Sequence, residues 1–295
     1  MGFSEDPELQ PVLFGLFLSM YLVSVLGNLL IILAVSSDSH LHTPMYFFLS
    51  NLSWADIGFI STTIPNLIVN IQIHSRVISY VGCLTQMSLF LTFGGMDRML
   101  LTVMAYDRFV AICHPLNYHV IMNPRLCVTF LLVSFFFSFV ETQLHLLAAL
   151  QMTNFKDAKI ANFFCDPSKV LNLSCSDTFT NNIIQYLVAT MYGIFPILGI
   201  LFSYYKILSS ILSMPSSGGR YKAFSTCGSH LSVVFIFLGT GICVYIDSVL
   251  SDSSRNNAVS SLMYSVVTPI LNPFIYSMRN RDIKSALKMI YGRIV

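Results

Sequence analysis

The chain has 295 residues, of which 55% are hydrophobic and only 10% are charged, and its formal net charge is +2. Water-exposed domains carry about 25% charged residues, so this composition excludes an ordinary globular protein with a water-facing surface. The small net charge also gives no reason to expect a nucleic-acid partner.

The hydrophobic residues gather into blocks of roughly 20, the length that crosses about 30 Å of hydrocarbon as a helix. Because lipid offers backbone groups no hydrogen-bond partners, each block is expected to be helical. We therefore predict an all-α integral membrane protein with one seven-transmembrane helix bundle over residues 1–295. In chain order the predicted spans are Val12–Val35, Met45–Ile73, Val81–Ala111, Leu126–Leu150, Ile183–Leu212, His230–Ile246 and Ala258–Met278.

The distribution of Lys and Arg predicts the orientation, because basic connections stay in the cytosol. The less basic of the two sets of connections between spans holds Arg76, Lys156, Lys159, Lys169 and Arg255. The more basic set is expected to be cytosolic, which places the N-terminus outside and the C-terminus inside. Residues 1–10 hold no Lys or Arg, so we expect no cleavable signal. The basic set is Arg108, Arg125, Lys206, Arg220, Lys222, Arg279, Arg281, Lys284, Lys288 and Arg293.

Two shorter segments complete the pattern. In the C-terminal tail, Ile283, Leu287 and Ile290 recur at helical spacing among basic residues. This predicts a short amphipathic eighth helix over residues 279–292 that lies on the inner leaflet. Residues 216–219, with the sequence SSGG, are expected to form a flexible loop.

Polar residues inside predicted spans are costly in lipid and usually functional. Asp56 and Asp97 belong to the second and third spans and could meet in the bundle interior. A sodium ion between them would remove the cost of burying two carboxylates. The alternative from the residues alone is one protonated carboxyl in a hydrogen-bonded network.

Arg98 is the least expected of these residues. It precedes Arg108 by about 15 Å along a helix axis, hence near mid-membrane, where a guanidinium needs a partner. Asp97 is adjacent and points about 100° away, whereas Glu141 is the only acidic residue of the fourth span. We therefore predict an Arg98–Glu141 ion pair, with snorkelling or water entry as the alternative.

Residues 104–118, at the inner end of the third predicted span, have the sequence MAYDRFVAICHPLNY. This stretch resembles the Asp-Arg-Tyr signature in the version found in odorant receptors, a branch of the rhodopsin-like G-protein-coupled receptors. Residues 41–49 (LHTPMYFFL), 222–231 (KAFSTCGSHL) and 269–276 (PILNPFIY) agree in the proper order, as do Gly27-Asn28 and Asp56. These stretches are distributed over nearly the whole chain.

The resemblance implies a two-state receptor, not an enzyme, that sits in the plasma membrane and activates a stimulatory heterotrimeric G protein. Arg108 is expected to be restrained by Asp107 at rest and released toward Tyr204, His230 and the G protein on activation. Asn272, Pro273 and Tyr276 are expected to form the movable inner part of the seventh helix. Asn28 joins Asp56 and Asp97 in the expected site for an allosteric sodium ion. No other cofactor is expected.

The resemblance also places a ligand pocket in the upper bundle. Its walls are mainly apolar, with two phenolic hydroxyls and no acid, which suits a small volatile with at most one polar group and argues against an amine. At each position plain helix packing is the competing interpretation. The expected lining is Met87, Phe90, Leu91, Gly94, Val188, Tyr192, Ile242, Tyr245 and Leu262.

Cysteines and a sequon add covalent expectations. The resemblance implies a disulfide from Cys83 to Cys165 in the second outer loop, an oxidising location. Position 155 is Phe where the family usually has a cysteine, so Cys175 is expected to be a free thiol unless it competes for Cys83. Asn172-Leu173-Ser174 is a candidate glycosylation site. The family's glycosylated N-terminal segment is not expected in this chain.

Other membrane functions fit less well. A retinal-binding photoreceptor requires a Lys in the seventh span, and Ala258–Met278 contains none. Repeats and paired broken helices, which are typical of transporters, are missing from the sequence. The alternative that remains is a receptor-like protein that folds but is impaired in trafficking or coupling, because of Arg98, Phe155 and the short N-terminal segment.

Overall fold

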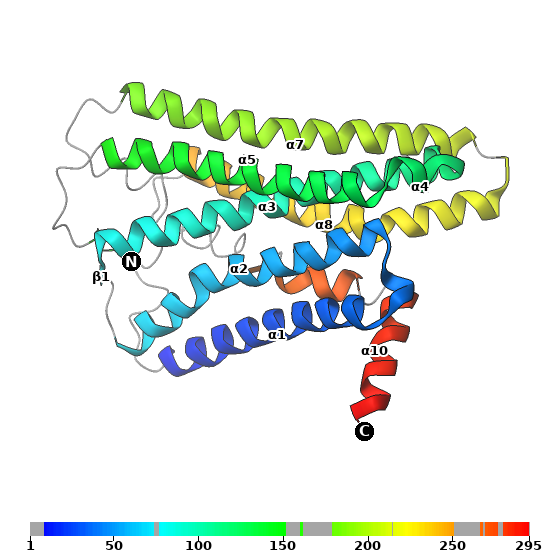
Figure 1. Cartoon of the computed structure of the whole chain (residues 1–295). Helices are drawn as coiled ribbons and strands as arrows, with labels where there is room; N and C mark the ends of the chain where they lie inside the picture. Colours follow the sequence, from blue (N-terminus) through cyan, green and yellow to red (C-terminus); the bar gives the residue numbers. More distant parts are fainter. Residues whose placement is uncertain are drawn as a thin grey trace.

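The computed structural model describes residues 9–73, 77–151, 160–161, 179–213, 215–250, 266–267, 269–276 and 280–294. Its long helices run side by side as a bundle, and a short terminal helix turns away from the bundle axis (Figure 1). Residues 266–267 and 269–276, within the seventh predicted span, are also helical. In chain order the helices are α1 (Gln10–Ser37), α2 (Pro44–Gln72), α3 (Tyr80–Cys113), α5 (Pro124–Gln151), α7 (Phe179–Ser213), α8 (Ser217–Leu250) and α10 (Arg281–Ile294).

Short elements lie between the long helices. A 3-10 turn, η1 (Ser39–Leu41), joins α1 to α2, and η2 (Pro115–Asn117) with the one-turn helix α4 (Tyr118–Ile121) joins α3 to α5. Strand β1 (Val77–Ile78) pairs antiparallel with β2 (Ile160–Ala161). The sequence did not predict this pairing, because a two-residue strand has no alternation to detect.

Side-chain caps fix where several helices begin. The Ser79 hydroxyl accepts the Gly82 N–H at 3.1 Å at the start of α3, and Asn123 Oδ1 accepts the Leu126 N–H at 3.0 Å at the start of α5. The Ser216 hydroxyl does the same for the Gly219 N–H at 3.0 Å. The prediction of a flexible loop over residues 216–219 was therefore wrong from Ser217 on, since the serine cap starts α8 there.

The sixth long helix, α8, is therefore longer than the sixth predicted span. It begins 13 residues before His230, where the predicted span started. At 1.5 Å per residue the extra helix is about 20 Å long, so α8 continues well beyond the apolar segment from which the span was predicted.

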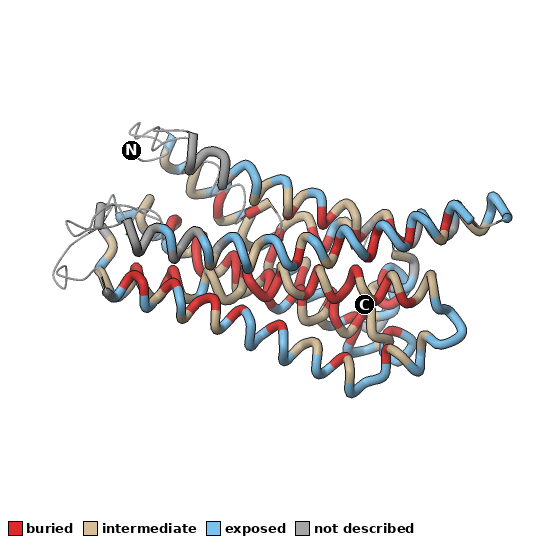
Figure 2. Tube along the Cα trace, turned by 90° about the horizontal axis from the view of Figure 1, so that it is seen from above, coloured by how far each residue is buried: buried red, intermediate tan, exposed pale blue. Residues whose placement is uncertain are grey.

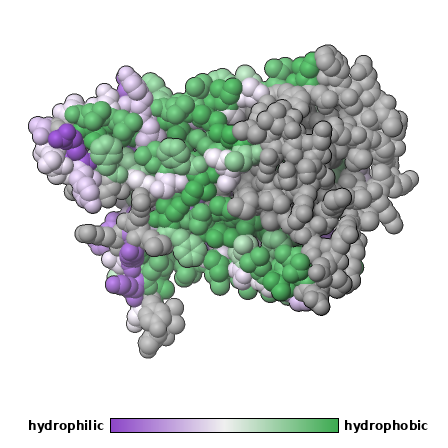
Figure 3. Space-filling view, turned by 180° about the vertical axis from the view of Figure 1, so that it is seen from behind, coloured by the Kyte–Doolittle hydropathy of each residue, from purple (hydrophilic) through white to green (hydrophobic). Residues whose placement is uncertain are grey.

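The outer surface of the bundle is apolar. Buried residues face inward and exposed ones outward along the long helices (Figure 2), and the exposed ones include Leu26, Phe136 and Leu201. Hydrophobic side chains cover the middle of the face seen in Figure 3, with hydrophilic ones at one end. By length and composition α1, α3, α5 and the Thr190–Ser213 part of α7 can each cross a membrane, and α8 has a shorter apolar stretch, His230–Cys243.

Helix α3 is the central element among the described helices, because it packs against α2, α5, α7 and α8. Its Leu100 and Leu101 side chains are buried in one cluster with Leu52 of α2 and Ile207 of α7. Residues on α3 can therefore contact most of the described helices. The polar contacts of Arg98 and Arg108, described below, both involve this helix.

Helix α10 confirms the predicted amphipathic tail. Ile283 and Ala286 are fully buried against the bundle, whereas Lys284 and Lys288 are exposed. The Tyr46 hydroxyl of α2 donates to Asp282 Oδ2 at 2.9 Å and accepts from Asn280 Nδ2 at 2.9 Å. These bonds tie the start of α10 to α2.

Gly95 allows α5 to approach α3 closely. A Cβ atom at this position would lie 3.0 Å from the Ser138 Cβ and 3.2 Å from Glu141 Oε2. Thr92 and Thr142 hydroxyls meet across the same interface at 3.0 Å. The absence of a side chain at position 95 therefore sets the spacing at which α3 and α5 exchange polar contacts.

We expect Gly95→Ala to lower the melting temperature of the purified protein in detergent, because the methyl group forces α3 and α5 apart at a cost of about 1–3 kcal/mol. Gly15→Ala is the matched control, since nothing lies within 4 Å of its Cβ position. There the better helix propensity of alanine should leave the melting temperature equal or higher. Equal melting temperatures for the two variants would contradict the close packing.

Candidate functional site

One polar cluster lies at the end of the bundle that carries Arg108, Lys206 and α10, which we call the basic end. Arg108 Nη2 donates to Asp107 Oδ2 at 2.8 Å, and both side chains are buried. The Tyr118 hydroxyl donates to the other oxygen, Oδ1, at 2.7 Å. Burial raises the pKa of Tyr118, and the Asp107 charge raises it further, so this phenol keeps its proton and remains a donor. Asp107 is therefore held from two sides.

A second contact lies beside this cluster. His230 Nε2 is 3.1 Å from the Leu101 carbonyl, and because a carbonyl only accepts, Nε2 must carry a proton. In a neutral imidazole Nδ1 is then the acceptor, and the Tyr204 hydroxyl donates to it. The two rings also stack, with centroids 5.8 Å apart. This contact joins α3, α7 and α8, and the charge of Arg108 acts on both rings.

Asn272 links the seventh helical segment to α2. Its Nδ2 donates to both oxygens of Asp56, at 3.0 and 2.8 Å, and both side chains are buried. Tyr276, one turn further, is buried, and its hydroxyl has no hydrogen-bond partner in the part of the chain that the structure describes. Pro273 lies against α1, because a Cβ on Gly27 would meet its ring at 3.1 Å. Asn272 and Pro273 thus lie at contacts of the seventh helical segment with α2 and α1, and their role in switching stays a prediction.

The residues of the predicted sodium site are buried in the same region. Both oxygens of Asp97 and Oδ1 of Asn28 have no hydrogen-bond partner among the described residues, and the Asp56 charge acts on Asp97. Asn28 uses its Nδ2 to donate to the Ser24 and Pro269 carbonyls, at 3.1 and 3.0 Å. Unpaired carboxylate and amide oxygens are the donors that a hard cation prefers, so these residues fit a sodium ion.

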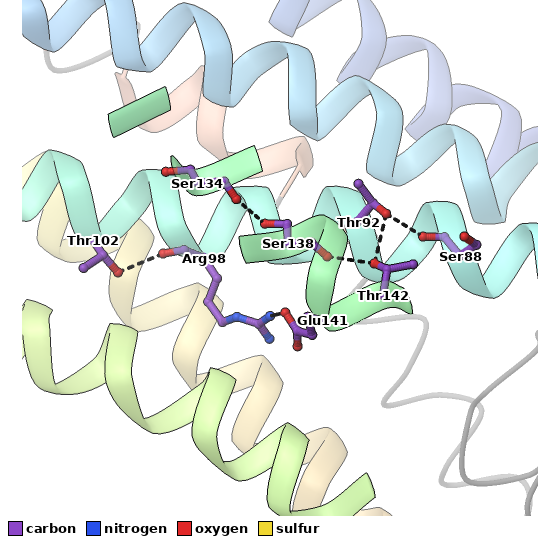
Figure 4. Close-up of polar contacts among 8 residues, drawn as sticks. All are labelled: Ser88, Thr92, Arg98, Thr102, Ser134, Ser138, Glu141 and Thr142. Atoms are coloured by element: carbon purple, nitrogen blue, oxygen red, sulfur yellow. Dashed lines mark hydrogen bonds and ion pairs between the residues drawn. The ribbon is translucent and has the colours of Figure 1, made fainter. Parts of the chain in front are cut away.

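The Arg98–Glu141 ion pair predicted from the sequence is confirmed. Arg98 Nη2 contacts Glu141 Oε2 across the α3–α5 interface that Gly95 brings together, and Figure 4 shows the two side chains pointing toward each other. The carboxylate is almost fully buried, and the Arg98 side chain is 22% exposed. The alternatives of snorkelling or water entry are not needed to explain this contact.

The predicted ligand-contact residues of α3 are in close contact with protein. The Phe90 ring lies 4.7 Å from that of Phe59, a Cβ on Gly94 would meet the same ring at 3.0 Å, and Met87 is buried near Cys83. Leu91 packs partly buried in that cluster. Whether any of them contacts a ligand stays a prediction.

Elsewhere the predicted lining is more open. Val188 is half-buried and Ile242 is exposed, while Leu262 and the Tyr245 side chain lie outside the described residues. Tyr192 borders a groove of about 510 Å³ between α3, α5 and α7. The groove is lined by Met99, Thr102, Phe137, Met191, Tyr192, Phe195 and Pro196.

The covalent expectations are described only in part. Cys83 is disulfide-bonded, but Cys165, Cys175 and Asn172 lie outside the described residues. The pairing with Cys165 and the glycosylation of Asn172 therefore stay predictions. Cys113, Cys127, Cys227 and Cys243 are free thiols.

Two contacts of the basic end were missed from the sequence. Tyr118 lies inside a quoted motif, but nothing in its spacing indicates that it reaches back to Asp107. Tyr46 likewise gave no sign of its bonds to Asn280 and Asp282. In both cases the signal available was only an aromatic hydroxyl near the expected membrane boundary, where such residues are common for other reasons.

Comparisons with known proteins agree on one family. A family model described as "Olfactory receptor" matches residues 17–293. Olfactory receptor 7E24 of Homo sapiens is 68% identical over the whole chain, which covers 87% of that relative. Olfactory receptor 7E178 of Mus musculus is 67% identical, with 100% of this chain and 89% of the relative covered. Olfactory receptor 7D4 of Homo sapiens is 60% identical, with 99% and 94% covered.

Neutralising either Arg98 or Glu141 alone is expected to destabilise the purified protein by about 3–5 kcal/mol, because a buried charge loses its partner. The double change Arg98→Met with Glu141→Gln should recover much of that loss. Melting temperature and surface expression of the four forms provide the test. Simple additivity of the two single effects would refute an energetically coupled pair.

Proposed function

The chain belongs to the olfactory receptor family of G-protein-coupled receptors, and on this premise we propose that it detects a small, mostly apolar volatile within its helix bundle and activates a stimulatory G protein. As a family member it is a multi-pass plasma-membrane receptor that binds odorants, couples to a G protein and catalyses no reaction. The proposal concerns the ligand class, the type of G protein and the residues that act.

The observation that carries the proposal is the double restraint on Asp107. Arg108 is the cation that the family uses at the coupling surface, and here it is bonded to Asp107, which Tyr118 also holds. This arrangement keeps the guanidinium inside the basic end. We assign it to the resting state, in which Arg108 is not available to a partner.

Activation then requires these contacts to exchange. An agonist that prefers an open arrangement of α3, α7 and α8 shifts the population toward it by its differential affinity. The Tyr204–His230 contact and the Asn272–Asp56 bonds link the helices that must move. In the open state Arg108 turns toward Tyr204 and the inserted C-terminal helix of the G protein, while Pro273 and Tyr276 shift with the seventh helix.

Sodium would act as an allosteric ion for the resting state. Asp56, Asp97 and Asn28 would hold it, and its charge would offset that of two buried carboxylates. The unpaired oxygens of Asp97 support this assignment over a fully satisfied hydrogen-bond network. An ion that binds only the closed bundle favours that state by mass action.

The competing proposal was a receptor-like protein impaired in trafficking or coupling. One of its three supports was an unpaired Arg98 at mid-membrane, and Arg98 is paired with Glu141. No described contact now favours this alternative over a working receptor.

Arg108→Ala is expected to abolish agonist-driven cAMP in cells that express the chain with a trafficking leader, while surface expression stays near that of the wild type. The change removes the coupling cation without emptying a hydrophobic core site, and Asp107 keeps the hydrogen bond from the Tyr118 hydroxyl. Arg125→Ala, an exposed cation at the same end, is the matched control and should signal. Undiminished cAMP from the Arg108 variant would overturn the assignment.

Sodium is expected to raise the melting temperature of the purified receptor relative to choline at equal ionic strength. At sodium tenfold above its Kd the ion contributes about 1.4 kcal/mol. Asp56→Asn and Asp97→Asn should each remove this difference, whereas Asp38→Asn, outside the site, should keep it. A wild-type protein that melts alike in both salts has no such site.

A further inference from the structure

The Arg98–Glu141 ion pair leaves donor capacity unused. A guanidinium carries five N–H donors, and the buried Arg98 Nε has no hydrogen-bond partner within the described ranges. One turn beyond Glu141, the His145 side chain is 6% exposed and its Nδ1 is also unpartnered. The charge of Arg98 acts on that ring, so the groups lie near one another. Unmade hydrogen bonds in a water-free interior are costly.

The groove between α3, α5 and α7 adjoins this polar cluster. Thr102 of the groove follows Arg98 by one helical turn, and Phe137 precedes Glu141 by one turn, so each lies on the same helix face as its charged neighbour. Tyr192 of α7 lines the groove, and the charge of Glu141 acts on its hydroxyl. Arg98 and Glu141 are not among the residues that line the groove, and we place their ion pair beside one end of it from these three neighbours.

The remainder of the groove is apolar and open toward the lipid side. Phe137, Met191 and Phe195 line it and are 45%, 54% and 65% exposed on the outer surface of the bundle. Its volume of about 510 Å³ is within the usual range for small-molecule sites. A hydrophobic molecule dissolved in the membrane can reach it without passing through water.

The charges select among hydrophobic occupants. A carboxylate would meet Glu141 and an amine would meet Arg98, so each would face a like charge in low dielectric. A hydrocarbon would leave the guanidinium donors unused. A neutral molecule with a carbonyl oxygen accepts one of these N–H groups and brings no charge of its own.

We propose that the groove between α3, α5 and α7 binds a neutral apolar molecule with one carbonyl oxygen, a ketone, aldehyde or ester, which accepts a hydrogen bond from the Arg98 guanidinium. The inference rests on the proposed odorant-binding function and names the ligand class, and it places the ligand in a groove that shares only Tyr192 with the lining expected from the sequence. Arg98 is then a specificity determinant, and Glu141 positions it and neutralises its charge.

The test uses the purified full chain in phosphatidylcholine nanodiscs, with 2-octanone, n-nonane and octanoate at pH 8 as probes. Affinities are measured from the shift of melting temperature with probe concentration. We expect 2-octanone to bind about tenfold more tightly than n-nonane, the factor that one hydrogen bond to a charged group contributes. Octanoate should bind no better than the alkane.

Two variants locate the site. Arg98→Met with Glu141→Gln removes both charges together, which avoids an unpaired buried charge, and should bind 2-octanone and n-nonane equally. Met191→Trp fills the groove from a lipid-exposed position and should weaken both about tenfold. A wild type that does not prefer the ketone, or a double variant that keeps the preference, overturns the proposal. If the double variant does not fold, unchanged ketone affinity in Met191→Trp overturns it.

A parallel cAMP assay separates this inference from the proposed function. Arg98-dependent binding of 2-octanone without any cAMP response to volatiles would support the site and contradict stimulatory coupling. Volatile-driven cAMP without Arg98-dependent ketone binding would support the receptor function and overturn the site.

Discussion

The hydrocarbon core of a membrane contains no water, so each buried polar group must find its partner inside the protein, and this constraint organises the described polar contacts. Arg98 is bonded to Glu141, Arg108 to Asp107, and Asn272 of the seventh segment to Asp56. Each contact except that within α3 joins two helices. The contacts between helices therefore do more than satisfy the hydrogen-bonding capacity of the polar residues. They also fix which helices lie together and at what rotation.

The same constraint makes the unsatisfied atoms informative. Among the described residues they include both oxygens of Asp97, Nε of Arg98 and the Tyr276 hydroxyl. Each lies in the interior of the bundle, beside a partnered charge or at a contact assigned to switching. In a protein with two arrangements, a group that lacks a partner in one state can gain it in the other or from a ligand. This is the physical reason to place the ion, ligand and switch near these atoms.

The sequence was sufficient to predict features that depend on composition, and contacts of single residues whose depth in the membrane was known from the predicted spans. Apolar blocks predicted the helices, and a lone acid on the fourth span predicted the partner of Arg98, because lipid allowed few alternatives. Contacts that depend on helix rotation or loop path, such as Tyr118 with Asp107 and Tyr46 with Asp282, could not be predicted, since many hydroxyls lie at similar depth. The early start of α8 was missed because its first turns are polar and carry no membrane signal, although Ser216 is an ordinary helix cap.

We propose that the volatile ligand and the G protein communicate through one equilibrium between closed and open bundles, in which the Asp107–Arg108–Tyr118 contacts belong to the closed state. Linkage requires that two partners which prefer the same state each raise the affinity of the other by the same factor. The most direct measurement is the affinity of an activating volatile for the receptor in nanodiscs, with and without nucleotide-free stimulatory G protein. We expect tighter binding of the volatile when the G protein is present, and a return to the weaker affinity when guanine nucleotide is added. An affinity that does not change under either condition would contradict it.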